Sequence, residues 1–270
     1  MKTAVAELDL KTATSLDQAL ATLHSESRTP LAGATDLYVE LNFGTLKPRR
    51  FLDLWALDEL REISFRGDTL VIGSLTTFTA LIRSPLVATH LPMLVEAARL
   101  VGGIQIQNRG TLGGNIANAS PAGDSLPILA AVDAVLVLRS AESERRVPLT
   151  EFYTGYRKSV LRPDELITAV EVQPVEGTQF FRKVGTRAAL AISKVVMAGV
   201  KGAVPRIAFG SVAPMVLRAR QTEQALAAGT HIEDVVRILE REIAPIDDLR
   251  SSAAYRRQVA GNLLRRFWSS

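Results

Sequence analysis

The stretch Gln107–Pro127, QNRGTLGGNIANASPAGDSLP, decides how the rest of the chain is interpreted. It holds four glycines, three asparagines and two prolines, and its only charged residues are Arg109 and Asp124. Closely spaced glycines leave backbone amides unshielded and also reach positive φ, so that successive N–H groups can converge on one point. Such a stretch can bind a diphosphate without lysine. The alternative is a tight surface turn capped by asparagine and serine.

A second stretch of the same character, PLAGATDLYVEL, occupies residues 30–41. Gly33 and Thr35 can present further amides and a hydroxyl there, although an ordinary loop before a helix is the alternative. The glycine spacing in neither stretch is G-x-G-x-x-G or G-K-[ST], so neither the Rossmann nor the P-loop pattern applies. Two amide-rich stretches in one chain favour a long ligand with two phosphates.

Composition excludes several classes of function. The chain has 270 residues, 47% apolar and 22% charged, which suits one large globular domain or two modest ones. A net charge of +4 is too mild to indicate nucleic acid as a partner. Because there is no cysteine, this chain itself carries no disulfide, thiolate nucleophile or cysteine-ligated iron–sulfur cluster.

Metal and membrane sites are not expected either. His24, His90 and His231 are scattered without metal-ligand spacing. No apolar run reaches transmembrane length, and the first twenty residues carry acidic side chains and no apolar signal segment. We therefore expect no membrane association and a cytoplasmic location.

Hydrophobic patterning predicts interspersed helices and strands without a regular βαβ alternation. Helices are expected over 15–28, with Ser15 as N-cap, over 76–87 and over 91–103, the last ending at Gly102–Gly103. Short strands are expected within 48–57 and 68–77, and 127–140 runs from a helical turn into a buried strand. After a boundary near Pro174–Thr178, a second α+β unit is expected to contain helices over 220–228, 232–243 and 252–268.

Several segments together resemble one known family. PLAGATDL, FLDLWALDELREI, LVIGSLTT, NRGTLGGNIANASPAGDSLPILAAVDA and GYRKSVLRPDELI are similar to the FAD-binding (medium) subunit of the xanthine dehydrogenase and carbon monoxide dehydrogenase family of molybdenum hydroxylases. SVAPMVLRARQTEQAL and the stretch from APIDDLRSS onward resemble the C-terminal flavoprotein domain of that family. The resemblance covers nearly the whole chain, and TLGGNIANASPAGD is its most specific part.

The resemblance implies the fold. We expect an α+β protein with a two-lobed FAD-binding domain of the PCMH type over residues 1–175, its lobes at about 1–55 and 56–175. A smaller α+β C-terminal domain with an antiparallel sheet is expected over 176–270. The cofactor is expected between the two lobes.

The resemblance also implies a set of cofactor-binding residues, with no catalytic side chain and no metal ligand. These are Leu31, Ala32, Gly33, Ala34, Thr35, Asp36, Leu37, Gly102, Thr111, Gly113, Gly114, Asn115, Asp124, Tyr156, Ile167 and Lys183. Ile167 matches an apolar residue packed on the cofactor, Lys183 matches a lysine close to the flavin, and Tyr156 and Arg157 lie where a loop approaches the isoalloxazine ring.

Each of these side chains also has a purely structural interpretation. Tyr156 can be an amphipathic loop anchor, Lys183 a solvated strand-end charge, and Asp124 an N-cap for the following helix. The arginines within 255–267 can form a solvated or docking helix face. Asp124 can cap a helix and bind a ligand at once.

Two positions depart from the family pattern. Ala34 stands where a second glycine is common, which costs about 1 kcal/mol if that position requires positive φ. Gln107 stands where arginine is frequent, which puts a salt bridge there in doubt.

The implied function is that of an oxidoreductase subunit. Its FAD takes electrons from [2Fe-2S] clusters on a small subunit, after a molybdopterin-bearing large subunit has oxidised the substrate, and passes them to NAD or another acceptor. The alternatives are a stand-alone flavin-dependent oxidase of the vanillyl-alcohol oxidase type and a non-catalytic nucleotide-binding scaffold. The substrate stays open among purines, aldehydes, other heterocycles and carbon monoxide.

Overall fold

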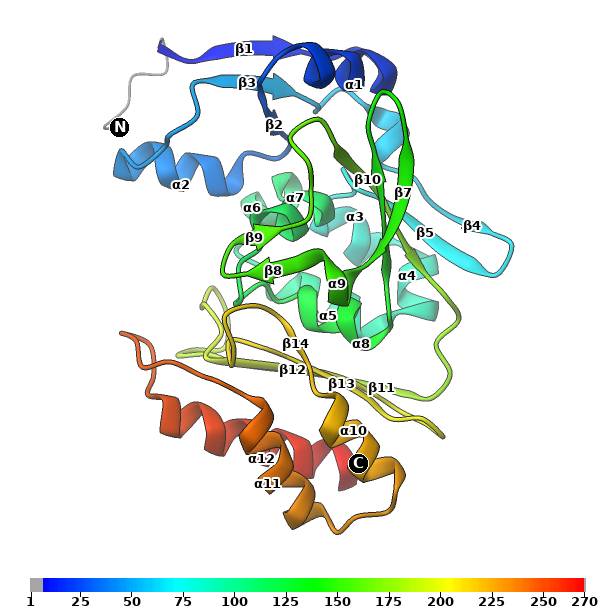
Figure 1. The fold of residues 1–270 in the computed structure, drawn as a ribbon, viewed down its shortest axis with the longest axis vertical. Helices are drawn as coiled ribbons and strands as arrows, with labels where there is room; N and C mark the ends of the chain where they lie inside the picture. Colours follow the sequence, from blue (N-terminus) through cyan, green and yellow to red (C-terminus); the bar gives the residue numbers. More distant parts are fainter. Residues whose placement is uncertain (1–6, 270) are drawn as a thin grey trace.

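A computed structural model describes residues 7–269, and its first lobe is a small parallel sheet with two helices (Figure 1). The strand order is β1-β3-β2, and both neighbours of β3 run parallel to it. The elements are β1 (Asp9–Thr12), α1 (Leu16–Ser25), β2 (Thr29–Leu31), α2 (Thr35–Phe43) and β3 (Arg50–Asp53). Because α2 follows β2 closely, the turn between them, Ala32–Thr35 (the AGAT turn), lies at one end of this sheet.

The second lobe is a five-stranded antiparallel sheet, ordered β4-β5-β10-β6-β7, with helices packed against it. Its strands are β4 (Ile63–Arg66), β5 (Thr69–Gly73), β6 (Val135–Arg139), β7 (Glu144–Pro148) and β10 (Leu166–Val172). Its helices are η2 (Asp58–Leu60), α3 (Phe78–Arg83), α4 (Pro85–His90), α5 (Pro92–Arg99), α6 (Ile104–Arg109), α7 (Leu112–Asn118), α8 (Leu126–Ala131) and α9 (Leu149–Phe152). A hairpin of β8 (Tyr153–Gly155) and β9 (Lys158–Ser159) projects beside α7.

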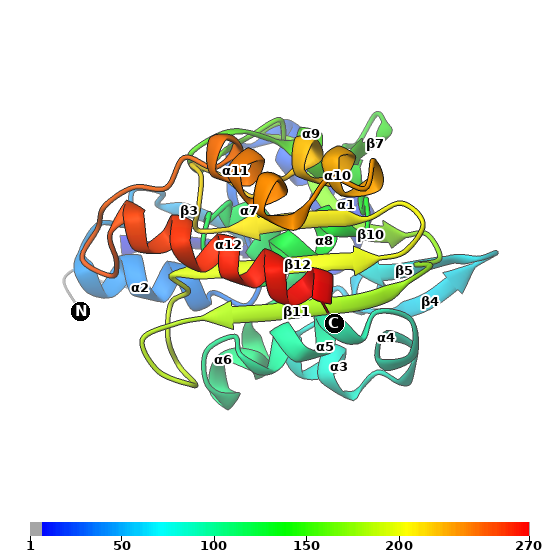
Figure 2. The same ribbon diagram turned by 90° about the horizontal axis from the view of Figure 1, so that it is seen from below.

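The C-terminal unit is a four-stranded antiparallel sheet covered on both faces. Helices α10 to α12 lie across one face, and α5 and α8 of the second lobe pack on the other (Figures 1 and 2). Its elements are β11 (Thr178–Val184), β12 (Val195–Lys201), β13 (Arg206–Gly210), β14 (Leu217–Arg218), α10 (Arg220–Ala227), α11 (Ile232–Glu242) and α12 (Ala253–Ser269). The central strand β12 is consequently apolar nearly throughout, as a strand covered on both faces must be.

The α+β fold with a two-lobed N-terminal part and an antiparallel C-terminal sheet is confirmed. The predicted helix over 15–28 forms as α1, and the Ser15 side chain accepts a hydrogen bond from the Gln18 N–H. No helix among residues 7–269 is long and apolar enough to cross a membrane.

Three local predictions were wrong. The helix expected over 76–87 is divided into α3 and α4 at Ser84–Pro85, because proline lacks an N–H and Ser84 caps the new helix instead. The helix expected to end at Gly102–Gly103 ends at Arg99, and Gly102 adopts φ +54° beyond it. The glycine-rich stretch, Gln107–Pro127, was expected to be a loop or a tight surface turn, but it contains all of α7, the end of α6 and the start of α8.

Candidate functional site

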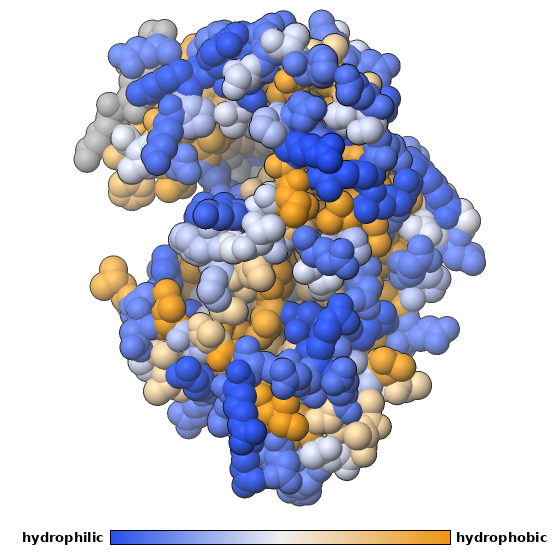
Figure 3. Space-filling view, viewed as in Figure 1, coloured by the Kyte–Doolittle hydropathy of each residue, from blue (hydrophilic) through white to orange (hydrophobic). Residues whose placement is uncertain are grey.

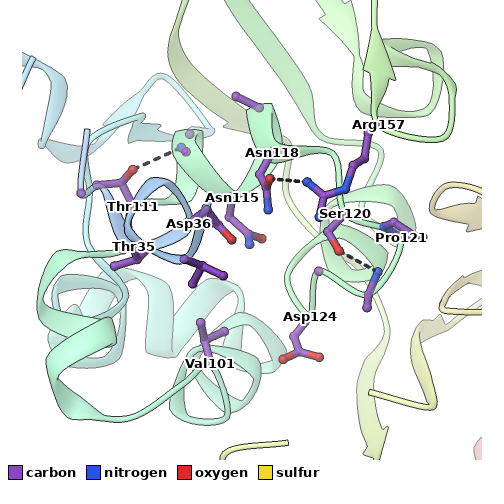
Figure 4. A pocket seen from close by; sticks show the side chains of 18 of the residues that line it. Thr35, Asp36, Val101, Thr111, Asn115, Asn118, Ser120, Pro121, Asp124 and Arg157 are labelled. Carbon is purple, nitrogen blue, oxygen red and sulfur yellow. Dashed lines mark hydrogen bonds between the residues drawn. The ribbon is translucent and has the colours of Figure 1, made fainter. Parts of the chain in front are cut away.

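A cavity of 1120 Å³ lies between the first lobe, the second lobe and the C-terminal unit. Figure 3 shows the surface hollowed beneath the first lobe, and Figure 4 shows side chains that line the cavity. Its wall is formed by residues 32–37, by α7 and the segment to Asp124, by the β8–β9 hairpin, and by residues of the C-terminal unit. Pockets for drug-sized ligands span roughly 300–1,000 Å³, so this cavity has room for an extended ligand.

The AGAT turn presents free backbone donors to the cavity. Ala34 has φ +61° and precedes the first turn of α2. The N–H groups of Thr35, Asp36 and Leu37 have no hydrogen-bond partner among residues 7–269. Unpaired N–H groups at the start of a helix carry partial positive charge. This turn therefore offers the amide donors that an anionic group requires.

The glycine-rich stretch does not offer the donors that its sequence suggests. The Gly113 N–H donates to the Ser74 carbonyl at 2.8 Å, and the Gly114 N–H donates to Thr111 Oγ1 at 3.2 Å. The Leu112 N–H is likewise paired, with Thr76. These N–H groups at the start of α7 are therefore already hydrogen-bonded within the protein, and the role of Gly113 and Gly114 in binding the cofactor stays a prediction.

Gly113 is required by packing. A Cβ atom on it would lie 2.6 Å from the Cβ of Ser74 and 2.8 Å from its carbonyl oxygen, closer than real Cβ contacts. The glycine thus allows α7 to lie directly against the end of β5. Both Gly113 and Gly114 still line the cavity with their backbone.

Polar side chains on α7 complete this part of the wall. Asn115 Oδ1 accepts from Ser125 Oγ at 2.7 Å, and Asn118 Oδ1 accepts from Arg157 Nη1 at 2.9 Å. Figure 4 shows Asn115 beside Asp36, across the cavity from Asp124. The side-chain nitrogen Nδ2 of Asn115 has no partner within residues 7–269, so it remains a donor for a ligand.

Lys183 and Asp124 form a buried ion pair at the opposite part of the wall. Lys183 Nζ lies 2.5 Å from Asp124 Oδ2 and also donates to the Leu100 carbonyl at 3.1 Å. Burial outweighs the nearby ammonium group and raises the pKa of Asp124 to about 6. Asp124 Oδ1 is buried without a hydrogen-bond partner in the described part of the chain. A buried acceptor of this kind can accept a hydrogen bond from a ligand donor.

Most of the predicted site residues come together here. All of them line the cavity except Leu31, which points its side chain into the apolar cluster of Leu41, Leu46 and Phe51. Tyr156 is 62% exposed at the cavity wall, whereas Ile167 is buried in β10. These are the lining residues: Ala32, Gly33, Ala34, Thr35, Asp36, Leu37, Gly102, Thr111, Gly113, Gly114, Asn115, Asp124, Tyr156, Ile167 and Lys183.

Some structural interpretations of single residues are now excluded. Lys183 is not a solvated charge, since its side chain is 8% exposed. Asp124 is not an N-cap of α8, because Ser125 occupies that position and makes no capping hydrogen bond. Gln107, at the position where arginine is frequent, donates through Nε2 to the Arg99 carbonyl at 3.2 Å.

The C-terminal unit contributes residues that sequence reasoning missed. Ser193, Ser211, Asp248 and Arg256 line the cavity. Arg256, expected on a solvated or docking helix face, is buried and donates to the Ser211 carbonyl at 2.8 Å and to Asp248 Oδ1 at 2.7 Å. No local pattern marks these residues, because only the docking of the two units brings them beside the glycine-rich stretch.

A two-lobed α+β unit with a cavity between its lobes, followed by a smaller unit with an antiparallel sheet, defines a class of flavoprotein. Residues 6–174 match the family described as the FAD binding domain in molybdopterin dehydrogenase, and residues 179–270 match the CO dehydrogenase flavoprotein C-terminal domain. The chain belongs to this family of FAD-binding subunits of molybdenum hydroxylases, and it is an oxidoreductase subunit of that family.

Individual relatives agree with this assignment. The chain is 33% identical to the carbon monoxide dehydrogenase medium chain of Hydrogenophaga pseudoflava, over 87% of this chain and 86% of the relative. It is 36% identical to the putative xanthine dehydrogenase FAD-binding subunit of Escherichia coli, over 84% of this chain and 82% of the relative. The structure of reconstituted CO dehydrogenase from Oligotropha carboxidovorans matches with a TM-score of 0.90 at 30% identity, covering 96% of this chain and 95% of that one. The resemblance seen in the sequence is confirmed.

Proposed function

We propose that this chain carries FAD in a molybdenum hydroxylase complex and relays electrons from [2Fe-2S] clusters on a small subunit to NAD or another acceptor. The observation that carries the proposal is the cavity, which offers the free N–H groups of Thr35 to Leu37 at one part and the unpartnered acceptor Asp124 Oδ1 at another. A ligand that satisfies both must be long, anionic in one part and rich in hydroxyl or N–H donors in another. FAD has that chemistry.

The residues present fit each part of FAD. The first turn of α2 suits the diphosphate, because free amides at a helix N-terminus bind phosphate groups. Asp124 Oδ1 suits a ribityl hydroxyl or a ring N–H, and Asn115, across the cavity beside Asp36, adds a side-chain donor. Ile167 and Tyr156 supply apolar and aromatic surface for the ring system. The chain's contribution is to bind, orient and shield the flavin, which itself supplies the redox chemistry.

The electron donor is proposed to lie outside these 270 residues. This sequence has no cysteine and therefore no ligands for an iron–sulfur cluster of its own. We accordingly propose a small [2Fe-2S] subunit and a large molybdopterin-binding subunit as partners. We also propose that residues 1–175 form the FAD-binding domain, with lobes at about 1–55 and 56–175, and that 176–270 form the second domain. The cytoplasmic location stays a prediction.

The test is to purify this chain alone and titrate it with FAD. We expect one FAD to bind, giving a yellow protein that oxidises neither xanthine, an aldehyde nor a heteroaromatic substrate. With FAD reduced by dithionite, it is expected to pass electrons to an acceptor. Adding the two partner subunits is expected to restore substrate oxidation.

Other results would favour the alternatives. Robust oxidation of any of these substrates by the single chain would identify a stand-alone flavin oxidase. A chain that binds no flavin under any condition would be a scaffold without a redox role.

A further inference from the structure

The AGAT turn and the glycine-rich stretch touch through backbone alone. A Cβ atom on Gly33 would lie 1.7 Å from the Arg109 carbonyl oxygen and 3.1 Å from the Gly110 nitrogen. The first lobe therefore rests directly on the chain between α6 and α7. Any shift of one turn against the other changes the width of the cavity that both of them line.

The Arg109 side chain leaves this contact and stacks on Trp55. Its guanidinium carbon lies 3.6 Å from the centroid of the Trp55 ring. The Arg109 side chain makes no hydrogen bond or ion pair with any side chain of residues 7–269. The stack on Trp55 is therefore the interaction that holds the guanidinium group of Arg109 in place. Tryptophan is the aromatic side chain that attracts cations most strongly.

Trp55 is itself held in place at the end of β3. The backbone N–H of Trp55 donates to Asp53 Oδ1 at 2.9 Å, and the backbone carbonyl of Trp55 accepts a hydrogen bond from Arg61 Nη2. The Arg61 guanidinium also lies over the ring, 4.2 Å from its centroid, while its Nη1 donates to the Leu75 carbonyl at 3.1 Å. Trp55 is therefore a fixed point at which the first lobe is joined to the second.

Neither Trp55 nor Arg109 lines the cavity, but their neighbours do. Leu54 precedes Trp55, and Gly110 and Thr111 follow Arg109. We propose that the Trp55–Arg109 stack is a positioning contact, which holds the AGAT turn and the glycine-rich stretch at the separation that FAD requires. The proposal rests on the FAD site proposed above and deepens it.

The experiment compares FAD affinity among variants of the full chain. Arg109→Met and Trp55→Leu remove the stack, whereas Arg109→Lys keeps the cation and Trp55→Phe keeps an aromatic ring. Arg83→Met is the matched control, because Arg83 is an exposed arginine at the end of α3, which packs against α6. We expect the two variants that remove the stack, Arg109→Met and Trp55→Leu, to weaken FAD binding by roughly tenfold, or 1.4 kcal/mol. The FAD dissociation constants of the two conservative variants and of the Arg83→Met control are expected to stay within about threefold of the wild-type value.

A second measurement needs no FAD. Because the chain has no cysteine, Tyr38→Cys on α2 and Ala88→Cys on α4 give two unique, exposed sites for spin labels. We expect a narrow distribution of label distances in the apoprotein. Arg109→Met is expected to broaden it, while Arg109→Lys and Arg83→Met leave it narrow.

The two measurements separate the possible failures. Unchanged FAD affinity or an unchanged distance distribution in Arg109→Met would overturn the positioning role. If the wild type binds no FAD, the proposed function fails, and the distance distribution alone decides whether the stack positions the turns. If Trp55→Leu does not fold, Trp55→Phe and the two Arg109 variants still give the answer.

Discussion

Lys183 Nζ lies 2.5 Å from Asp124 Oδ2, and both side chains are 8% exposed. Lys183, for which the family resemblance implies a position near the flavin, is therefore not a free cation, because a carboxylate already faces it. The ion pair also joins two units of the protein, since Lys183 belongs to β11 of the C-terminal unit and Asp124 precedes α8 of the second lobe. The charge that the cavity presents to a ligand depends on the pair as a whole.

Breaking the pair is expected to destabilise the protein more than removing it. Lys183→Met leaves a buried carboxylate without its cation, at a cost of about 3–5 kcal/mol. Asp124→Asn is expected to cost less, because burial already disfavours the charged form of this carboxyl group. The double variant should lose clearly less than the sum of the two single losses. Urea unfolding of the apoprotein at pH 8 measures this coupling. Additive losses would show that the two side chains do not depend on each other.

The same carboxylate makes stability depend on pH. Asp124 has its pKa raised from 3.8 to about 6 in the folded protein, chiefly by burial. Between these values the folded state binds more protons than the unfolded state, so this group's contribution to the free energy of unfolding falls as pH rises from 4 to 7. The fall is on the order of 3 kcal/mol. The stability of the wild type minus that of Asp124→Asn should therefore decline over this range, and a difference that rises or stays flat would contradict the assignment.

Ala34 is expected to be suboptimal in this chain. Its φ of +61° strains any residue with a Cβ atom, and no side-chain cap compensates it. Ala34→Gly should raise the free energy of unfolding by about 0.5–1 kcal/mol, since relief of strain exceeds the added freedom of the unfolded chain. Ala21→Gly, at an exposed position within α1, is the control and should lower it by about 1 kcal/mol. Equal destabilisation by both changes would argue against strain at Ala34.

Gly33 is expected to tolerate no side chain. In Gly33→Ala the new Cβ atom would overlap the Arg109 carbonyl oxygen at 1.7 Å, which forces the first lobe away from the second. We expect loss of FAD binding and a clearly lower unfolding temperature. Gly155→Ala is the matched control, because a Cβ atom there meets nothing within 4 Å. FAD titration and thermal unfolding of both variants test the contrast, and a Gly33→Ala protein that binds FAD normally would refute it.

FAD affinity is expected to depend little on salt. The buried cations of the cavity wall already face carboxylates, as Lys183 does with Asp124 and Arg256 with Asp248. The proposed phosphate donors are neutral amides, so few ion pairs are available for screening. The dissociation constant should change by less than about threefold between 0.05 and 0.5 M sodium chloride. A much steeper dependence would indicate that a cation such as Arg157 contacts the phosphates directly.

The sequence by itself determined the class of fold and the location of the site. The spacing of glycines, asparagines and prolines in Gln107–Pro127 and the AGAT turn identified the family, and nearly all of the residues carried over from it line one cavity. The absence of cysteine also excluded a cysteine-ligated iron–sulfur cluster on these 270 residues. These conclusions need only residue types and their order, which is what a sequence records.

Only the tertiary structure decided which groups are available to a ligand. The amides of Gly113 and Gly114 are occupied because Ser74 and Thr111 come within hydrogen-bonding distance, whereas those of Thr35 to Leu37 have no partner in the part of the chain that the structure describes. Lys183 is neutralised by a residue 59 positions away, and Arg256 is buried by packing between distant segments. Whether a polar group is free depends on every atom within about 3 Å of it, and most of those atoms come from residues far along the chain.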